Sequence, residues 1–163
     1  MGGYVGALSY LFSFTGRINR GKYWLAILIY MLVWIAFIAA VISWLGGLNT
    51  DRLFSLVGGG LLIWLGAIAL IVAGTWSGFA TGVKRLHDRG KSGWWILLFW
   101  FGPTVLSGSN SAMPDIQGSS ILALAGSVIA IWGFIELCCL RGRTGPNKYG
   151  PDPLAQPHQT PGA

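Results

Sequence analysis

Long apolar runs alternate with short polar segments along this chain. The stretch from Tyr23 to Thr50 contains no Asp, Glu, Lys or Arg. It predicts a first transmembrane helix over about 23–45, about 34 Å long at 1.5 Å per residue, which exceeds a hydrocarbon core of about 30 Å. Tyr23 and Trp24 at one end and Trp44 at the other are typical of the aromatic belts at membrane surfaces.

A second uncharged stretch predicts a tilted span over about 57–82. Within it, Gly74, Gly78 and Gly82 follow one another at intervals of four residues, so they share one helix face. Such a face lets a neighbouring helix approach closely, and we expect a packing seam against another span or another subunit. Chance spacing is the alternative explanation, because the chain contains 25 glycines.

The third apolar segment, over about 93–106, is short and contains Pro103. Its length of about 20 Å predicts either a short span or a re-entrant hairpin. If it spans, ten of the eleven Lys and Arg residues lie on one side, whereas a hairpin leaves seven against four. Because Lys and Arg favour cytoplasmic loops, we expect four spans with both termini inside, the fourth over about 121–140 and an external loop over 107–120.

Basic residues are confined almost entirely to three clusters between these runs. The clusters are Arg17/Arg20/Lys22, Lys84/Arg85/Arg89/Lys91 and Arg141/Arg143/Lys148. Charged residues form only 10% of the chain against about 25% in ordinary soluble domains, so the net charge of +6 indicates membrane orientation and excludes nucleic-acid binding. Anionic lipid headgroups at the cytoplasmic face are the expected partners, with a homo-oligomer or a membrane-protein partner as further expectations.

The segments outside the predicted bundle differ in character. Residues 1–22 predict a short interfacial helix, because Tyr4, Leu8, Leu11 and Phe12 lie near helical spacing. Residues 141–163 predict a cytoplasmic turn motif followed by a disordered, proline-rich tail. Within the turn motif, Asn147, Gly150 and Asp152 are candidates either for docking on the basic loops or for binding a partner.

Three stretches of the chain carry a resemblance to a known family. They read FSFTGRINRGKYW at 12–24, KRLHDRGKSGWW at 84–95 and GPNKYGPDP at 145–153. Read together, they resemble the bacterial inner-membrane family catalogued as domain of unknown function 805, the YhaH-like membrane proteins. The resemblance covers nearly the whole chain and implies a small multi-pass protein of the bacterial inner membrane. It implies no activity, because the family has no established one.

The second of these stretches is the densest polar segment, with Arg85, His87, Asp88, Arg89, Gly93 and Trp94 as candidate functional or structural residues. Gly90-Lys91-Ser92 is not a phosphate-binding loop, since the required earlier glycine is Arg85 and no strand precedes it. His87 and Asp88 are open to two interpretations. They relay protons or hold a metal, or else Asp88 fixes a tight turn between the second and third spans, either by accepting from the backbone of its own loop or by pairing with Arg85.

Glu136 is the one acidic residue within a predicted span, near its cytoplasmic end. An ionisable group in a span is a functional candidate by default. Because Glu136 lies close to the interface, we expect a structural ion pair with Arg85 or Arg17, and the alternative is proton or substrate handling. Arg17 and Arg20 of the first basic cluster are candidates for the same surface.

Catalytic motifs are not found in the sequence. It contains neither HExxH nor Gly-x-Ser-x-Gly, and the spans contain neither His nor Asp. We therefore expect no enzyme, no cofactor and no metal site. The favoured prediction is an all-α integral membrane protein that serves as a structural or interaction helix bundle with a basic cytoplasmic face. The alternative is an oligomeric small transporter or channel that uses Glu136, with His87 or Asp88 at its mouth.

Overall fold

The computed structural model describes residues 6–45, 60–112 and 119–155. They form the helices α1 (Ala7–Phe12), α2 (Arg20–Leu45), α4 (Leu61–Asp88), α5 (Trp95–Ala112) and α6 (Ser119–Phe134), and α6 continues into the π-helix η1 (Ile135–Cys139). Within these ranges there is no strand, only an isolated bridge between Asn147 and Gly150. The predicted all-helical fold is confirmed for the part of the chain that the structure describes.

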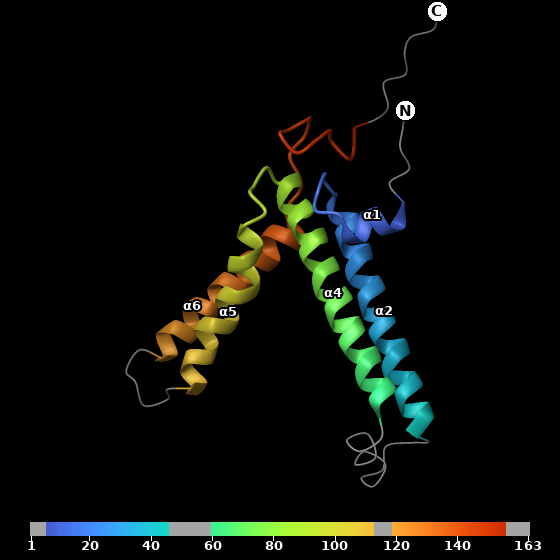
Figure 1. Ribbon diagram of the computed structural model, residues 1–163. Coiled ribbons are helices and arrows are strands. Elements are labelled where there is room, and N and C mark those ends of the chain that lie inside the picture. Colours follow the sequence, from blue (N-terminus) through green and yellow to red (C-terminus); the bar gives the residue numbers. More distant parts are fainter. Residues whose placement is uncertain (1–5, 46–59, 113–118, 156–163) are drawn as a thin grey trace, which may run out of the picture.

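The helices form two antiparallel pairs that diverge like the legs of an inverted V (Figure 1). One leg is α2 with α4, the other is α5 with α6, and α1 lies crosswise beside the start of α2. We call the end where the legs meet the apex: there α2 begins, α4 ends, α5 begins and η1 ends. Since both ends of the described chain also lie at the apex, segments far apart in sequence meet there.

Three helices are long and apolar enough to cross a membrane, namely Arg20–Leu45, Leu61–Asp88 and Ser120–Cys139. Their apolar side chains are largely exposed, as at Leu62, which is 83% exposed, and Ile121, which is 71% exposed. A water-soluble protein would bury such residues, whereas a bilayer solvates them. The legs therefore present lipid-facing surfaces.

The α5 helix is longer than the third predicted segment. It has 18 residues, a length of about 27 Å, and continues through Pro103. The external loop predicted over 107–120 is wrong at both ends, because 107–112 belong to α5 and α6 begins at Ser119; residues 113–118 lie outside the described part. Close packing of α5 on α6 extends the helix past its apolar stretch: a Cβ on Gly126 would lie 3.1 Å from the Pro103 carbonyl oxygen.

The α4 helix also extends beyond its prediction, from about 82 to Asp88. It ends in a Schellman motif, in which Gly90 N–H donates to the His87 carbonyl and Lys91 N–H to the Leu86 carbonyl, both at 2.9 Å. Gly90 has a φ of +73°, which a glycine adopts without strain. The polar segment from Lys84 to Asp88 is thus the last turn of a helix and not a loop. The prediction ended too early because hydropathy shows where charged residues begin, not where a helix ends. The predicted start of this span at 57 lies outside the described residues.

Two of the three seam glycines lie under side chains of α5. A Cβ on Gly78 would be 2.7 Å from the Trp100 ring, and one on Gly82 would be 2.6 Å from Cδ1 of Ile96. Gly74 has no such neighbour within 4 Å. Large side chains of α5 therefore pack against α4 at Gly78 and Gly82.

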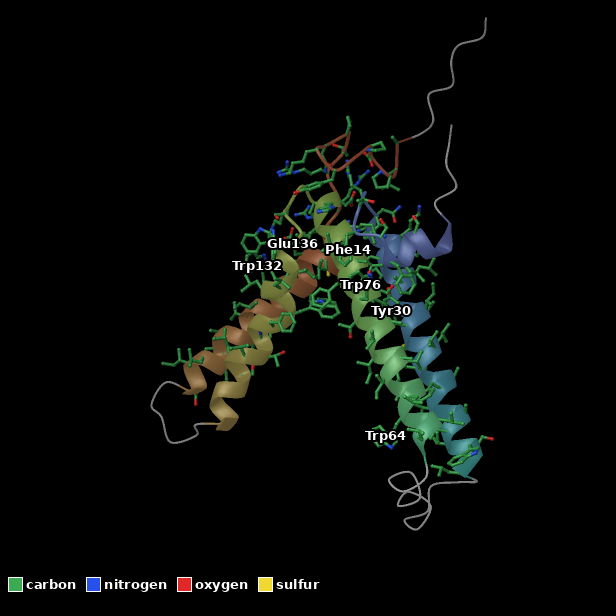
Figure 2. The ribbon with its side chains drawn as sticks, viewed as in Figure 1. Phe14, Tyr30, Trp64, Trp76, Trp132 and Glu136 are labelled. Carbon is green, nitrogen blue, oxygen red and sulfur yellow. The ribbon has the colours of Figure 1, made fainter. Side chains whose placement is uncertain are left out.

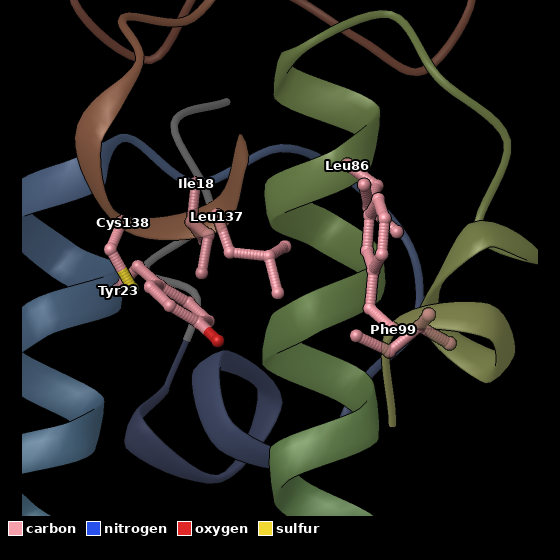
Figure 3. Close-up of a cluster of buried hydrophobic side chains, with 7 residues drawn as sticks. Ile18, Tyr23, Leu86, Phe99, Leu137 and Cys138 are labelled. Carbon is pink, nitrogen blue, oxygen red and sulfur yellow. The ribbon is translucent and has the colours of Figure 1, made fainter. Parts of the chain in front are cut away.

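A small apolar core lies just inside the apex (Figure 3). The segment before α2 and the elements α2, α4, α5 and η1 contribute to it: Ile18, Tyr23, Leu86, Ile96, Phe99, Leu137 and Cys138. Leu86 is completely buried and Phe99 is 7% exposed. This core joins the two legs and supports the polar groups above it.

Candidate functional site

Asp88 holds two arginines at the apex. Its Oδ1 accepts from Nη2 and Nε of Arg17 at 3.1 and 3.2 Å, and its Oδ2 accepts from Nη1 of Arg85 at 2.6 Å. All three side chains are buried, with exposed fractions of 1% for Arg17, 0% for Arg85 and 3% for Asp88. Charge-assisted hydrogen bonds of this kind are among the stronger ones in proteins, and here they join the N-terminal segment to the end of α4.

Arg17 also binds the C-terminal segment. Its Nη1 donates to the carbonyls of Gly145 at 2.7 Å and Gly150 at 3.3 Å, and its Nη2 donates to the Arg143 carbonyl at 2.6 Å. The Arg143 amide in turn donates to the Asp88 carbonyl at 2.9 Å. One guanidinium therefore clamps segments from both ends of the chain onto α4.

The second arginine of this network, Arg85, caps the C-terminal end of η1. Its Nε donates to the Leu137 carbonyl at 2.9 Å, and its Nη2 donates to the Leu140 carbonyl. Carbonyls at a helix C-terminus lack intrahelical partners and carry partial negative charge. They therefore compensate the second positive charge, which a single Asp88 carboxylate leaves unbalanced.

The π-helix η1 widens the last turn of the helix that begins as α6, and its carbonyl oxygens can accept hydrogen bonds from side chains. Trp24 Nε1 donates to the Cys138 carbonyl at 3.2 Å, and Arg20 Nη1 approaches the Cys139 carbonyl at 3.4 Å. π-Helices are rare and occur frequently at functional sites. Here the distortion connects η1 to α2 as well as to α4, and the side chains of Cys138 and Cys139 are free thiols.

Glu136 forms a second ion-pair group, on the side of the apex where α5 and η1 meet (Figure 2). Its Oε1 lies 2.9 Å from Arg89 Nε and 3.2 Å from Lys91 Nζ. The Lys91 ammonium also lies 5.6 Å from the Trp95 ring and 5.4 Å from the Trp132 ring, within range of cation–π attraction. The predicted partners of Glu136, Arg85 and Arg17, are wrong, because Asp88 already occupies both of them.

The C-terminal turn motif is held by its own polar side chains. Asp152 accepts from the amides of Leu154 and Gly145, each at 2.9 Å, and these bonds hold the pKa of its carboxyl below the usual value. Gly145 and Gly150 have φ of +79° and +137°, a region that favours glycine. Asn147 exchanges backbone bonds with Gly150 and donates its side-chain amide to the His87 carbonyl at 2.9 Å.

His87 is a stacking residue in this arrangement. Its ring lies parallel to that of Tyr149, with centroids 3.7 Å apart and an angle of 5° between the planes. Its Nδ1 lies 3.3 Å from the Gly16 carbonyl, which accepts, so the proton is assigned to Nδ1. His87 and Asp88 are thus adjacent in sequence but have different partners, and no group of three or more His, Cys, Asp or Glu residues occurs in the part of the chain described.

Two apex residues that sequence reasoning missed are structurally important. A Cβ on Gly142 would lie 1.9 Å from Asp88 Oδ2, so only glycine leaves room for that carboxylate. Lys84 is 3% exposed and donates to the carbonyls of Ser9 and Tyr10 near the end of α1. The only available signals were the position of Gly142 between two arginines and the position of Lys84 directly after an apolar run.

Beside the network, an apolar pocket of about 530 Å³ opens on one side of α4. Trp76, Phe79, Val83 and His87 form its α4 wall, and the other walls come from the N-terminal segment, the start of α5 and the C-terminal segment: Phe14, Ser92, Gly93, Trp94, Ile96, Leu97 and Tyr149. Phe14 packs edge-on against Trp76 at 5.2 Å (Figure 2). Gly93 packs close to α4, since a Cβ there would be 2.8 Å from Val83. Trp94 is 78% exposed beside it.

The buried polar side chains of the described apex all have hydrogen-bond partners. No buried side-chain nitrogen or oxygen among the described residues lacks a hydrogen-bond partner. A network satisfied in this way gives rigidity and a unique arrangement of its segments. The arrangement can hold segments together and present a charged face.

Comparisons with known proteins agree with the three stretches noted in the sequence. The chain matches the family described as "Protein of unknown function (DUF805)" over residues 11–151. It is 34% identical to the uncharacterized protein YiiR of Escherichia coli K12 over 88% of this chain and 87% of that protein. No solved structure matches.

Two further relatives are named inner membrane proteins. YhaH of Escherichia coli K12 is 27% identical over 94% of this chain and 98% of its own length, and YhaI of the same organism is 29% identical over 92% and 93%. Together with the three long apolar helices, they confirm the predicted location, a multi-pass protein of the bacterial inner membrane.

Proposed function

The chain belongs to the DUF805 family of proteins of unknown function, and we propose that it is a structural or interaction helix bundle without enzymatic activity. In this proposal it has four spans, with both termini and a basic face in the cytoplasm. The observation that carries the proposal is the Arg17–Asp88–Arg85 network, which ties the N-terminal segment, α4, η1 and the C-terminal segment into one body.

The arrangement of the legs supports four spans. Each helix pair leaves the apex and returns to it, so an even number of crossings brings both termini back to one side. The 18 residues of α5 give about 27 Å, close to the thickness of a hydrocarbon core. Every described Lys and Arg lies at the apex end of its helix or in the segments beside it, as expected for a cytoplasmic face.

Some basic residues at the apex are buried and others are exposed. Arg17, Arg85 and Lys84 are buried and serve the fold. The side chains of Arg20, Lys22, Arg141, Arg143 and Lys148 belong to exposed residues. This second group is the surface that we propose for anionic headgroups or for an acidic surface of another membrane protein, since each nearby basic residue contributes roughly 1 kcal/mol to attraction toward an anionic bilayer.

The alternative, an oligomeric transporter or channel that uses Glu136, has weaker support. The Glu136 side chain is 4% exposed and is held by two cations at the apex. Below that level, the described parts of the helices contain no Asp, Glu, Lys, Arg or His that would line an ion pathway.

Reporter fusions test the topology. Fusions after Ala163 and within the α4–α5 connection at Lys91 are expected to report the cytoplasm, and insertions in 46–59 and 113–118 the periplasm. A periplasmic reporter at Ala163 would make α5 re-entrant and the four-span proposal wrong. The structural role is tested by folded yield: charge removal at exposed Lys22 is expected to leave it unchanged, whereas removal at buried Asp88 lowers it.

A further inference from the structure

The apolar pocket beside α4 draws its walls from all three stretches that carry the family resemblance. Phe14 comes from the first, His87 and Trp94 from the second, and Tyr149 from the third. The ion-pair network holds these stretches together and so supports the walls of the pocket. Its volume of about 530 Å³ falls within the range of about 300–1,000 Å³ usual for small-molecule sites.

The shape of the pocket favours a chain-like ligand lying along α4. Trp76, Phe79, Val83 and His87 lie on one face of the helix at intervals of three, four and four residues. The distance from the first to the last is about 16 Å along the helix axis. The walls are aromatic and aliphatic from Trp76 up to Val83, where the indole N–H of Trp76 donates to the Phe12 carbonyl, and the other polar side chains, His87, Ser92 and Tyr149, lie at the apex end.

The position of the pocket favours a lipid over a water-soluble molecule. Trp76 and Trp94 are 56% and 78% exposed at its edge, as expected of rings in contact with lipid and headgroups. The polar end coincides with the last turn of α4, where the basic residues lie. A molecule entering from the bilayer would therefore meet apolar walls along its chain and a polar, basic end at headgroup level.

The polar end has positive charge available. The Lys148 ammonium lies 4.9 Å from the centroid of the Tyr149 ring, which stacks on His87. Lys148 is exposed and forms no ion pair in the described structure. With Nδ1 protonated toward Gly16, the neutral His87 ring has an acceptor at Nε2, which lies close to the pocket residue Gly93.

From this geometry we propose that the pocket is a binding site for one anionic glycerophospholipid of the inner leaflet. An acyl chain lies against Phe79 and Val83, and the phosphate lies at headgroup level beside Lys148. The site deepens the proposed function, because it rests on a cytoplasmic basic face, and it assigns that face a specific ligand instead of a diffuse attraction.

Native mass spectrometry of the full-length protein, exchanged into micelles or nanodiscs with phosphatidylglycerol or phosphatidylcholine, tests the site. We expect retention of one phosphatidylglycerol in preference to phosphatidylcholine. Leu97→Trp, at a half-exposed pocket residue, is expected to remove most of the bound lipid, whereas Leu98→Trp, at the equally exposed neighbour outside the pocket, retains it. Lys148→Gln is expected to reduce the preference for phosphatidylglycerol about fivefold, the effect of one lysine near an anionic surface, and Lys22→Gln to leave it unchanged.

Several outcomes would overturn the site. Equal retention of the two lipids overturns the preference for an anionic headgroup, and retention that survives Leu97→Trp excludes this pocket as the binding site. Competition by glycerol 3-phosphate, which has the phosphate but no acyl chain, would show a soluble anion site instead. Because the reporter fusions establish the location of the basic face separately, a failure of lipid retention with cytoplasmic termini overturns the lipid site and leaves the proposed function standing.

Discussion

Arg17 and Asp88 are separated by 71 residues in the chain, yet their side chains meet at 3.1 Å in a buried ion pair. The contact holds the N-terminal segment on the last turn of α4, in addition to any apolar packing between the legs. Burying two charges is unfavourable unless their remaining hydrogen-bonding groups are satisfied. In this protein backbone carbonyls of the C-terminal segment supply those partners, so the pair joins three distant parts of the chain.

Replacement of Asp88 is expected to be strongly destabilising. Asp88→Asn leaves Arg17 and Arg85 buried without a counter-charge, and removing one member of a buried ion pair typically costs about 3–5 kcal/mol. We expect a large loss of folded yield and a lower melting temperature in detergent. Asp152→Asn is the matched control, because that carboxylate accepts hydrogen bonds but forms no ion pair among the described residues. Equal melting temperatures for the two variants would contradict the central role of Asp88.

Gly142→Ala tests whether the space for Asp88 is essential. The added methyl group would lie 1.9 Å from Oδ2 and 2.5 Å from Cγ of Asp88, so the carboxylate has to move away from Arg85. Gly74→Ala is the control, since a Cβ there would meet no atom within 4 Å apart from its own stretch of helix, and alanine favours the helix. We expect a lower melting temperature and faster proteolysis of the C-terminal segment for Gly142→Ala alone. Unchanged proteolysis would mean that the clamp tolerates displacement of Asp88.

The contact of Gly82 with Ile96 is expected to show energetic coupling. Gly82→Ala places a Cβ 2.6 Å from Cδ1 of Ile96, and overpacking of this kind typically costs about 1–3 kcal/mol. Ile96→Val removes that Cδ1 atom, so the double variant is expected to recover part of the stability lost in Gly82→Ala. A double-mutant cycle of unfolding free energies measures the coupling. Additive effects of the two substitutions would mean that position 82 is not coupled to Ile96.

The turn motif is expected to loosen at acid pH. Backbone hydrogen bonds from Leu154 and Gly145 lower the pKa of Asp152 in the folded protein. A carboxyl with a depressed pKa contributes its full stabilisation above the unfolded value of about 3.9 and loses it as pH falls through the lower folded value. The protection factors of the Gly145 and Leu154 amides, which are the exchange rates corrected for the intrinsic effect of pH, are expected to fall across that range. Asp152→Asn should abolish this pH dependence, and protection factors independent of pH in the native protein would refute the assignment.

The apolar legs were predictable because a bilayer imposes a minimum length on every helix that crosses it. The ends of the helices were less so. Hydropathy falls at Val83, but α4 continues to Asp88, and the only sign of its end was Gly90, a glycine placed where a helix cap requires positive φ. Similarly, the serines after Leu106 predict a loop, although packing of α5 on α6 keeps them helical to Ala112.

For the site, residue identities were predictable and most pairings were not. Arg17, Arg85, Asp88 and Glu136 were all candidates from their positions near predicted span ends, and the Arg85–Asp88 pair follows from a spacing of three residues on a helix. The choice of partner for Glu136 depends on how η1 packs on the α4–α5 connection, which no local pattern encodes. The position of Gly142 between two arginines was its only signal in the sequence, because the need for glycine arises only once Asp88 lies beside it.

The hydrogen bonds of Arg17 also determine when, during synthesis of the chain, the apex can close. Its carbonyl partners at Gly145 and Gly150 follow it by 128 and 133 residues, so they leave the ribosome long after the first helix has entered the membrane. Until then Asp88 and Arg85 can pair with each other, but the guanidinium of Arg17 cannot complete its hydrogen bonds. A chain truncated before Gly145 can therefore insert its apolar helices and still lack a closed apex, so the synthesis of residues 145–150 is the step that completes the hydrogen bonds of Arg17.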